Sequence, residues 1–569
     1  MFLAKNFSNK TGRTYLQIVH SYRDTSGKTK RKVEKSLGYL DELEKTYTDP
    51  IAHFTEIAKQ MEADRIKNKY INIQLREDEK LDPNNANRKN YGHIVFSKIY
   101  HELQLDRFFN NKQRHTNFEF DSNSIMKVLL FSRLLYPCSK RKSTEIKERY
   151  FDKANFTLDD VYAGLSHFNS IAKEAQKFIH EQITENYGRD TSLLYYDVTN
   201  YYFETDKQDG FRMRGASKEK RKDPIVQMGL ALDRNSIPLG YQLFSGNTHD
   251  SQTLMPVLAN IKQEYDTKRI IVVADKALNS GDNIAFNTIL GDGYVYSQTI
   301  RGSSEAFKTY VLDEEGYVNF SDEYKMKSRT IPVEIHITVS KGKKKKMPID
   351  QKQIVFYSQN YSNRAKHKRD ELISKAIDLI NNPSKYRKST AYGAAGYVNN
   401  LDFDKETGEI LELGKTRFLD LERIKEEEKF DGYYSIITSE LDESDSKIID
   451  IYRGLWRIEE TFKITKSQLN ARPVFVYKEE HINAHFLICF ISLVIARLTE
   501  IRIKNKFSIA RILESLRQVE CSHIDSNHYL FDYIDEVTDA LESEFNVGFG
   551  KKAMTLGEIK RNFASVKKR

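Results

Sequence analysis

The amino-acid sequence predicts a multidomain protein of mixed α/β class. Its 569 residues are enough for several domains, and 39% hydrophobic with 30% charged residues allow buried cores in a soluble chain. Two interior strands are expected within residues 192–205 and 269–275, because apolar side chains occupy both faces of each run. Helical spacing of apolar residues appears on either side of these strands. This alternation indicates an α/β core flanked by further regions.

The charge balance favours a polyanionic partner. The formal net charge is +9 and the pI is about 8.9, which favours nucleic acid, although a Lys-rich chain can be basic without binding one. The three cysteines, Cys138, Cys489 and Cys521, lie far apart and lack the spacing of a zinc site. They fit a reducing compartment without disulfide bonds, so we expect a cytoplasmic protein.

No membrane association is expected. The most apolar run, residues 484–498, is too short to cross a bilayer and indicates a buried core helix. Residues 1–10 lack the long apolar segment of a secretory signal.

The first two segments are a basic hairpin with a linker, and a helical domain. Residues 1–90 contain a strand, a basic return strand, a helix and a linker. The return strand carries basic side chains on its outward face: Lys28, Lys30, Arg31, Lys32 and Lys35. They form either a solvated face or an arm that contacts phosphates, and both interpretations stay open. Residues 91–190 have helical periodicity and basic ends, and we expect an all-helical domain that binds DNA.

Residues 191–292 are expected to form the first part of the α/β core. The strand around Asp197 is followed by a hairpin of residues 225–233 and 238–246. A helix then leads to a second interior strand that ends at Asp275. Asp is depleted in strands, so both carboxylates need an explanation.

The rest of the chain is expected to contain an insertion, the second part of the core and a tail. Residues 293–429 show short alternating stretches, which predict a mostly β insertion. Residues 430–500 supply a last strand and the helix that carries Glu459. Residues 501–569 are expected to form a C-terminal helical region.

A single helix is expected over residues 448–469, with Glu459 on its apolar face. Steps of four and three place one seam on this helix: Ile448, Tyr452, Leu455, Glu459, Phe462, Lys466 and Leu469. A carboxylate aimed at a core costs several kcal/mol unless a cation or hydrogen bonds meet it. Glu459 is therefore either paired or a metal ligand, unless the helix is simply salt-bridged with a different face buried.

Asp197, Asp275 and Glu459 are the candidate metal ligands. In open α/β sheets, ligands bind at the carboxyl ends of strands, and both Asp residues lie near such ends. If the two strands are neighbours, their carboxylates repel and a divalent cation relieves the repulsion. Taken singly, each Asp is better explained as a cap or turn residue. A metal-free alternative pairs all three acids with Arg and Lys.

The order strand, hairpin, helix, strand, insertion, strand, acidic helix resembles the RNase H-like fold, and the chain resembles a DDE transposase of a bacterial insertion sequence. The similar group belongs to the IS-four-like superfamily and carries a Y-(2)-R-(3)-E-(6)-K signature. Tyr452, Glu459 and Lys466 match its spacing, whereas Leu455 stands at the Arg position. YYDVTNYYFE, IIVVADKAL, GHIVFSKIYHELQL and the N-terminal basic hairpin also resemble this group, so the similarity covers nearly the whole chain. Arg453 or Arg457 can take the place of the missing Arg.

The resemblance implies an activity and a set of site residues. It implies that Asp197, Asp275 and Glu459 bind two Mg²⁺ (or Mn²⁺) ions, cut DNA at the ends of the element, and transfer the freed 3′-OH into target DNA in cut-and-paste transposition. It further implies that DNA phosphates are contacted by basic and polar side chains of the same helix: Lys463, Lys466, Tyr452 and Arg457. The implied partners are double-stranded transposon ends and target DNA. The implied active form is a homodimer on paired ends, associated with the nucleoid.

Two other functions use the same residues. An RNase H-like nuclease would cleave DNA with the same acids and never join strands. A transposase-derived DNA-binding protein would bind without catalysis, although the presence of all three acids argues against it.

Overall fold

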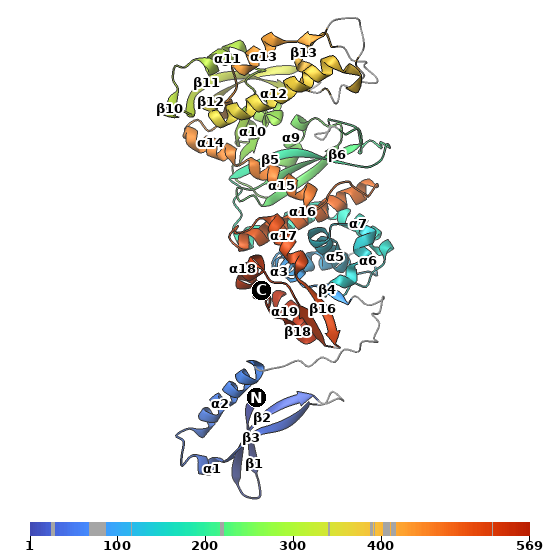
Figure 1. Cartoon of the computed structure of the whole chain (residues 1–569), viewed down its shortest axis with the longest axis vertical. Coiled ribbons are helices and arrows are strands. Elements are labelled where there is room, and N and C mark those ends of the chain that lie inside the picture. Colours follow the sequence, from blue (N-terminus) through green and yellow to red (C-terminus); the bar gives the residue numbers. More distant parts are fainter. Residues whose placement is uncertain are drawn as a thin grey trace. The chain divides into compact units, whose positions relative to one another are not determined.

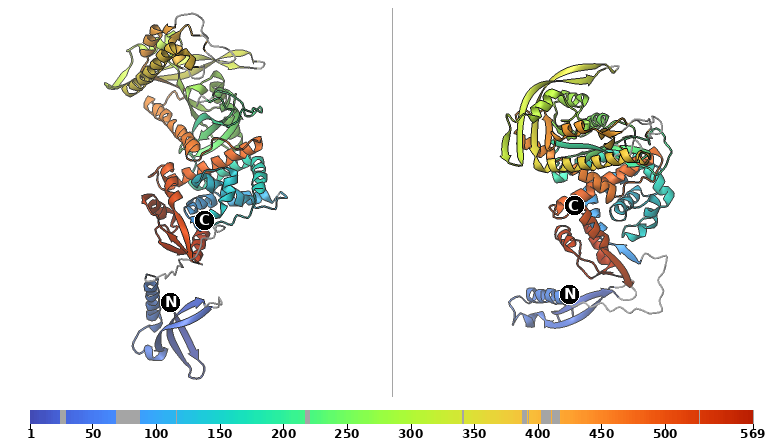
Figure 2. Two further views of the ribbon diagram at one scale, coloured as in Figure 1. Left: turned by 45° about the vertical axis from the view of Figure 1, so that its right-hand side comes forward. Right: turned by 45° about the horizontal axis from the view of Figure 1, so that its top comes forward.

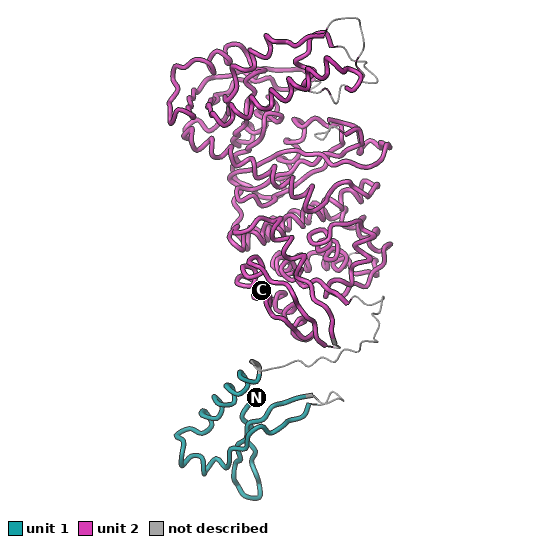
Figure 3. Tube along the Cα trace, viewed as in Figure 1, with its two compact units in different colours: residues 1–83 teal, residues 84–569 magenta. Residues whose placement is uncertain are grey.

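The structure is a computed structural model of residues 1–569. It describes the chain except for residues 24–28, 68–86, 115, 217–220, 340–341, 387–390, 392, 402–409, 411–416, 526 and 569. The chain divides into two compact units, Met1–Pro83 and Asn84–Arg569 (Figure 3). The linker expected within residues 1–90 and Lys28 both fall outside the described residues.

The N-terminal unit is a small antiparallel sheet with two helices. Its strands β1 (Phe2–Ser8), β2 (Arg13–Arg23) and β3 (Thr29–Tyr39) pair in the order β1-β2-β3. Helix α1 (Leu40–Leu43) follows, and α2 (Pro50–Lys67) packs against β1. The expected hairpin is β2–β3. Strand β1 was not predicted, because Ala4 is its one fully buried side chain and it lacks a clear alternating pattern.

The helical domain predicted for residues 91–190 is present in the second unit. Its helices are α3 (His93–Glu102), α4 (Leu105–Gln113), α5 (Ser122–Leu135), α6 (Lys140–Glu145), α7 (Leu158–Ser170) and α8 (Ala172–Tyr187) (Figure 1). Of these, α3, α5, α7 and α8 pack against the long helix α16 (Glu479–Arg502). By length and mean hydropathy (1.8), α16 is the one helix among the described residues that could cross a membrane. Because 94% of its apolar window is buried inside the protein, it is better explained as a core helix, as expected.

A nine-stranded sheet forms the centre of the second unit, in the order β10-β11-β12-β15-β9-β8-β5-β6-β7. Strand β5 (Leu193–Tyr202) pairs in parallel with β8 (Ile271–Ala274), which pairs in parallel with β9 (Gly293–Gln298). Strands β6 (Ile225–Leu232) and β7 (Pro238–Ser245) form the expected hairpin on the other side of β5. Helices α9 (Leu254–Glu264) and α10 (Gly281–Ile289) follow β7 and β8.

The strands expected in a separate β insertion extend this same sheet instead. Strand β15 (Tyr433–Thr438) pairs with β9 on one side and with β12 (Lys344–Ser358) on the other. Beyond β12 lie β11 (Tyr324–Thr338) and the short β10 (Val318–Ser321). The insertion also contains α11 (Glu305–Leu312), α12 (Gln359–Asn381), α13 (Leu421–Glu428) and a short pair, β13 (Val398–Asn399) with β14 (Phe418–Leu419). Helix α12 packs against β12 (Figure 2).

The C-terminal region is mixed rather than helical. Helices α17 (Ile509–Gln518), α18 (Glu536–Phe545) and α19 (Leu556–Val566) accompany a four-stranded sheet. This sheet consists of β18 (Ala553–Thr555), β17 (His528–Phe531), β16 (Glu520–Asp525) and β4 (Arg88–Asn90). The prediction missed these strands because they are short and because the partner of β16 lies far upstream in the sequence.

Both faces of β5 are buried, as the sequence predicted. Tyr195 and Tyr201 belong to a large core shared with the helical domain. Leu194, Tyr196 and Val198 belong to a second core, which α9 and α10 cover on the opposite face. Asp197 points to the same side of β5 as Tyr195 and Tyr201, and therefore lies on the face that packs against the helical domain.

Candidate active site

The register of two parallel strands places Asp197 and Asp275 at the same level. Leu193, Leu194 and Tyr195 of β5 pair with Ile271, Val272 and Val273 of β8. Continuing this register by two residues aligns Asp197 with Asp275, which directly follows β8. The two acids thus lie on neighbouring strands at the carboxyl end of β8, where α/β sheets bind ligands.

Asp275 is held by three hydrogen-bond donors. Its Oδ1 accepts from the backbone N–H of Lys276 (2.7 Å) and from the hydroxyl of Ser297 on β9 (2.7 Å). The hydroxyl of Tyr452 lies 3.5 Å from the same oxygen. Asp275 also caps the short 3₁₀ helix Lys276–Leu278. Together these donors fix the direction in which the carboxylate points.

Tyr452 lies in a pair with Tyr434, and their hydroxyls are 2.7 Å apart. Burial first, and the neighbouring Tyr434 and Asp275 next, raise the pKa of Tyr452 well above its usual range. Tyr452 therefore stays protonated at neutral pH and can donate to Asp275. The assignment of Tyr452 to a DNA phosphate stays a prediction, and in the structure its hydroxyl lies near the Asp275 carboxylate.

The helix expected over residues 448–469 is two helices. Helix α14 (Asp445–Arg453) ends at Gly454, and α15 (Trp456–Ser467) begins after Leu455. Gly454 lies directly against the ring of Tyr195, so that a Cβ there would be 2.2 Å from its hydroxyl oxygen. This close approach fixes the break above β5, two residues before Asp197.

Glu459 does not lie in a buried seam, which corrects the prediction. The buried face of α15 carries Ile458, Phe462 and Thr465, whereas Glu459 is exposed in the first turn. Because the helix is interrupted at Gly454, the spacing of four and three residues does not carry over from α14 to α15. Residues of the two helices therefore do not share the single apolar face that was expected. Glu459 instead lies near the positive end of the α15 dipole, which stabilises a carboxylate.

Helix α15 packs along β5 above Asp197. Tyr195 contacts Gly454 before α15 begins, and the hydroxyl of Tyr201 lies 2.9 Å from Oγ1 of Thr465 near its end. Asp197 lies between these two tyrosines on the same face of β5. The first turns of α15 therefore pass over Asp197.

The flank of α15 that carries Glu459 faces the Asp275 side of β5. Arg457 donates from Nη1 to the carbonyl oxygen of Arg234 (3.0 Å), in the turn between β6 and β7. Residues two apart on a helix differ by about 200° in direction, so Glu459 lies on the opposite flank from Arg457. Because β5 lies between β6 and β8, we expect that opposite flank to face β8 and Asp275.

The carboxylates themselves do not form a ligand cluster. Among the described residues, no three His, Cys, Asp or Glu side chains are arranged to hold one metal ion. Oδ1 of Asp197 accepts from the backbone N–H of Val198 (2.7 Å), and Asp275 is held by its own donors. The convergence of the three acids and the metal site both stay predictions. Their chemistry fits one, since carboxylate oxygens are the ligands that Mg²⁺ prefers.

The basic residues assigned to phosphates divide into two groups. Lys463 is exposed, and Lys466 is half-buried with its ammonium 5.9 Å from the ring centre of Tyr201. Both project from the same flank of α15 as Glu459. Arg457 is engaged with the backbone of Arg234, on the other flank.

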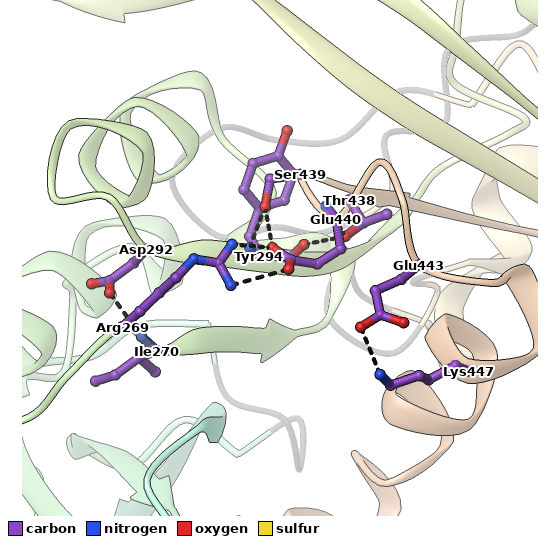
Figure 4. A network of polar contacts seen from close by, with 9 residues as sticks. All are labelled: Arg269, Ile270, Asp292, Tyr294, Thr438, Ser439, Glu440, Glu443 and Lys447. Atoms are coloured by element: carbon purple, nitrogen blue, oxygen red, sulfur yellow. Dashed lines mark hydrogen bonds and ion pairs between the residues drawn. The ribbon is translucent and has the colours of Figure 1, made fainter.

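A polar network lies at the end of β8 opposite Asp275 and holds the segment that leads from β15 into α14 (Figure 4). Arg269 donates to both carboxylate oxygens of Glu440, at 3.1 and 2.5 Å. The backbone N–H of Glu440 donates to Thr438 Oγ1 (3.0 Å), and that of Tyr294 donates to Ser439 Oγ (3.0 Å). These bonds join the start of β8, strand β9 and the end of β15, so the chain enters α14 from a fixed position.

Sequence reasoning missed three residues that position the site: Ser297, Tyr434 and Tyr195. Ser297 lies in β9, and its side chain is almost fully buried although it is polar. That isolated hydroxyl was the one available signal. Nothing in the sequence indicates that Tyr195 contacts Gly454 or that Tyr434 contacts Tyr452, because both contacts depend on the folded chain.

Comparisons with known proteins find two matching family models. The model of the IS1634 family transposase N-terminal domain matches residues 3–71, which include the small N-terminal sheet. The model of the transposase DDE domain matches residues 338–495, which include Glu459 but neither Asp197 nor Asp275. No curated protein matches the chain.

Two transposase–DNA structures show low structural similarity to the chain. One is the piggyBac transposase synaptic complex with hairpin DNA, at 6% identity, a TM-score of 0.36 and coverage of 84% of each chain. The other is the Mos1 transposase paired-end complex with the left transposon end, at 11% identity and a TM-score of 0.14, with 44% of this chain and 67% of that chain covered. These TM-scores are too low to establish a common fold. The two family models therefore support the identification of a DDE transposase of an insertion sequence.

Proposed function

We propose that this transposase moves its element by cut-and-paste transposition, with Asp197, Asp275 and Glu459 as the catalytic acids. It cuts double-stranded DNA at the ends of the element and transfers the freed 3′-OH into target DNA. The proposed active form is a homodimer on paired ends, in the cytoplasm and associated with the nucleoid. In this mechanism no side chain acts as a nucleophile, because water and then the freed 3′-OH attack the phosphodiester.

The strand order supports an RNase H-like core as the catalytic scaffold. The antiparallel strands β7, β6 and β5 are followed in the sheet by β8 and β9, which run parallel to β5. Helix α9 connects β7 to β8, and the acidic helix α15 packs on β5. This is the order of elements on which the resemblance to RNase H-like enzymes rests.

The three acids are the residues that would hold the proposed divalent ions, Mg²⁺ or Mn²⁺. Two such ions supply an activated water or 3′-OH and stabilise the leaving oxygen of an in-line displacement. Ser297, Lys276 and Tyr452 orient the Asp275 carboxylate before any ligand arrives. Glu459 lies in the first turn of α15, near the positive end of the helix dipole.

The basic side chains near the acids would hold the DNA backbone. Lys463 and Lys466 project from the Glu459 flank of α15, where their ammonium groups can neutralise phosphates next to the scissile bond. In the N-terminal unit, β3 exposes Arg31, Lys32 and Lys35. We assign this strand to sequence-independent contact with the ends of the element.

The observation that supports the proposal is the register of β5 and β8, which aligns Asp197 with Asp275 when it is continued by two residues. The contact of Arg457 with Arg234 on the β6 side leaves the flank with Glu459 for the β8 side. The test is Glu459→Gln compared with Glu460→Gln, its neighbour, whose carboxylate lies 4.0 Å from Arg497 on α16. The substrate is a plasmid that carries the two ends of the element, incubated with the full-length protein and Mg²⁺ or Mn²⁺. We expect Glu459→Gln to lose cleavage by at least about a thousandfold with DNA binding unchanged, and Glu460→Gln to stay active.

Asp197→Ala is the second test and should give the same loss of cleavage. Wild-type cleavage activity in Glu459→Gln or in Asp197→Ala would overturn the catalytic assignment. Cleavage by the wild type without joining to target DNA would identify a nuclease instead. DNA binding without cleavage under all metal conditions would identify a DNA-binding protein.

A further inference from the structure

A cavity of about 340 Å³ lies between the helical domain and the segment that follows α15. Its walls come from the end of α5, the start of α6, helix α7, residues 470–476 and helix α16. Five of the side chains that line it are basic, and none is acidic: Arg133, Lys140, Arg141, Arg472 and His485. The other polar side chains are Cys138, Ser139, Tyr162 and Asn470.

Two of these cations are buried without a counter-charge. Lys140 is 5% exposed and Arg133 is 6% exposed, and the described contacts of both side chains are to neutral groups. Arg133 donates to the carbonyl oxygens of Leu469 (3.0 Å) and Asn470 (3.1 Å), and its Nε has no partner among the described atoms. Burying a cation costs free energy unless an anion or hydrogen bonds compensate it.

The partner of Lys140 is a neutral histidine. His485 lies within hydrogen-bond distance of the carbonyl oxygen of Ala471 through Nε2 (3.1 Å) and of the Lys140 ammonium through Nδ1 (3.5 Å). A carbonyl oxygen can only accept, so Nε2 carries the proton and Nδ1 accepts from Lys140. Burial, Lys140 and Arg133 hold the pKa of His485 well below its usual range, so it stays neutral. This contact leaves the charge of Lys140 uncompensated.

The rim of the cavity is aromatic and open. Phe475 is 59% exposed and Tyr162 is 37% exposed, and both line the cavity. A cationic floor under an aromatic rim suits a nucleotide, since phosphates bind cations and bases stack on exposed rings. The volume is sufficient for a phosphate group with part of its nucleoside.

The cavity is joined to the strand that carries Asp197. The backbone N–H of Val474 donates to the carbonyl oxygen of Tyr202 at the end of β5 (3.1 Å). Tyr202 lies five residues beyond Asp197, which corresponds to about 16 Å along a strand. A DNA strand rises 3.4 Å per nucleotide, so this distance corresponds to about five nucleotides from the proposed cleavage point.

We propose that this cavity is a phosphate-binding site, with Lys140 and Arg133 as the charges that bind the anion and a DNA backbone phosphate as its occupant. The DNA source rests on the proposed function, whereas the phosphate chemistry rests on the cavity alone. The site is separate from the three acids and from the lysines of α15.

The first experiment measures the melting temperature of the full-length protein in inorganic phosphate and in chloride, at matched ionic strength and pH 7. We compare wild type, Lys140→Met, and Lys142→Met, which removes an exposed lysine of the same helix that pairs with Glu145. Phosphate should raise the melting temperature of wild type and Lys142→Met, but not of Lys140→Met. In chloride, Lys140→Met should melt no lower than wild type, because it removes an uncompensated buried charge. Lys140→Arg, which keeps the charge, should retain the phosphate effect.

The second experiment measures the affinity for a 30-base-pair duplex by fluorescence anisotropy over a range of salt concentrations. Loss of one phosphate contact should weaken binding by Lys140→Met about tenfold and reduce the salt slope by about one, with Lys142→Met unaffected. Burial and then Arg133 lower the pKa of Lys140 to about 7, so binding should weaken from pH 6 to pH 8 in wild type and not in Lys140→Met. The other titratable groups near Lys140 are Cys138 on the α5–α6 loop and His485 and Cys489 on α16.

Each outcome decides one part of the proposal. No phosphate effect in wild type, or the same effect in Lys140→Met, overturns the site. A Lys140-dependent phosphate effect with unchanged DNA binding identifies a small phosphate compound as the occupant and overturns the DNA source. If Lys140→Met and Lys142→Met weaken DNA binding equally, DNA is held by diffuse surface charge, and this result also overturns DNA as the source of the phosphate. A chain that never cleaves DNA but shows the Lys140-dependent phosphate effect refutes the proposed function and keeps the site.

Discussion

Replacing Gly454 by Ala tests how α15 is held above Asp197. A Cβ at this position would lie 2.2 Å from the hydroxyl oxygen of Tyr195 and 2.6 and 2.8 Å from two of its ring carbons. Ordinary carbon contacts begin near 3.5 Å, so the ring or the helix must move by about 1 Å. Tyr195 is 3% exposed, and its surroundings leave little room for that movement.

The expected cost can be set against an opposing gain. Overpacking a buried position costs about 1–3 kcal/mol. Gly454 has helical backbone angles, so Ala should otherwise stabilise it by about 0.5–1 kcal/mol. We therefore expect a net loss of about 1–2 kcal/mol in the free energy of unfolding. Because a 1 Å displacement of a catalytic group can cost about a hundredfold, cleavage should fall by about that factor.

The assay is urea denaturation combined with plasmid cleavage, and Gly164→Ala is the matched control. Gly164 lies inside α7, where an added Cβ would meet Ile125 at an ordinary 3.5 Å, so that variant should be slightly stabilised and fully active. Replacing Tyr195 by Leu in the Gly454→Ala background should recover at least about 1 kcal/mol as coupling energy. If Gly454→Ala is as stable and as active as Gly164→Ala, the proposed role of this contact is wrong.

Two further predictions concern the support of Asp275 and the pH dependence of stability. Ser297→Ala removes the 2.7 Å hydrogen bond to Asp275 Oδ1, so half-maximal cleavage should need about tenfold more Mg²⁺, whereas an unchanged metal titration would refute the orienting role. Burial first, and Arg189 next, lower the pKa of His180 to about 4, below its unfolded value of about 6.5. Between pH 4 and pH 6.5 the folded state therefore binds fewer protons than the unfolded state. The contribution of neutral His180 to stability is complete above pH 6.5 and is lost as the pH falls towards 4. His180→Phe, which keeps a ring stacked on Tyr265, should lose about 2 kcal/mol less than wild type between pH 7 and pH 4.5 in urea denaturation, and parallel losses would contradict the assignment.

The sequence was informative where a local pattern determines the structure. Strands β5 and β8 were predicted because their apolar residues occupy both faces, and the Asp residues near their ends were conspicuous for the same reason. The hairpin of β6 and β7 and the core helix α16 also follow from local patterning.

The rest depends on contacts between distant residues. The heptad reading continued through Gly454 because glycine is tolerated in a helical pattern, and Tyr195, which fixes the break, lies far upstream. Glu459 was consequently placed in a buried seam rather than on an exposed flank. Strands β11 and β12 alternate as a separate β domain would, and only their pairing with β15 shows that they belong to the central sheet. Ser297 gave a weak signal, because one hydroxyl in a strand does not reveal its acceptor.

The continuity of the central sheet has a consequence for engineering this enzyme. Strand β15 is hydrogen-bonded on both sides, to β9 and to β12. Deleting residues 318–358 to obtain a minimal transposase would leave one row of β15 amides and carbonyls without partners. Such a bare strand pairs readily with other chains, so the truncated protein would be prone to aggregate. A shortened variant would need a redesigned, charged outer strand in place of β12.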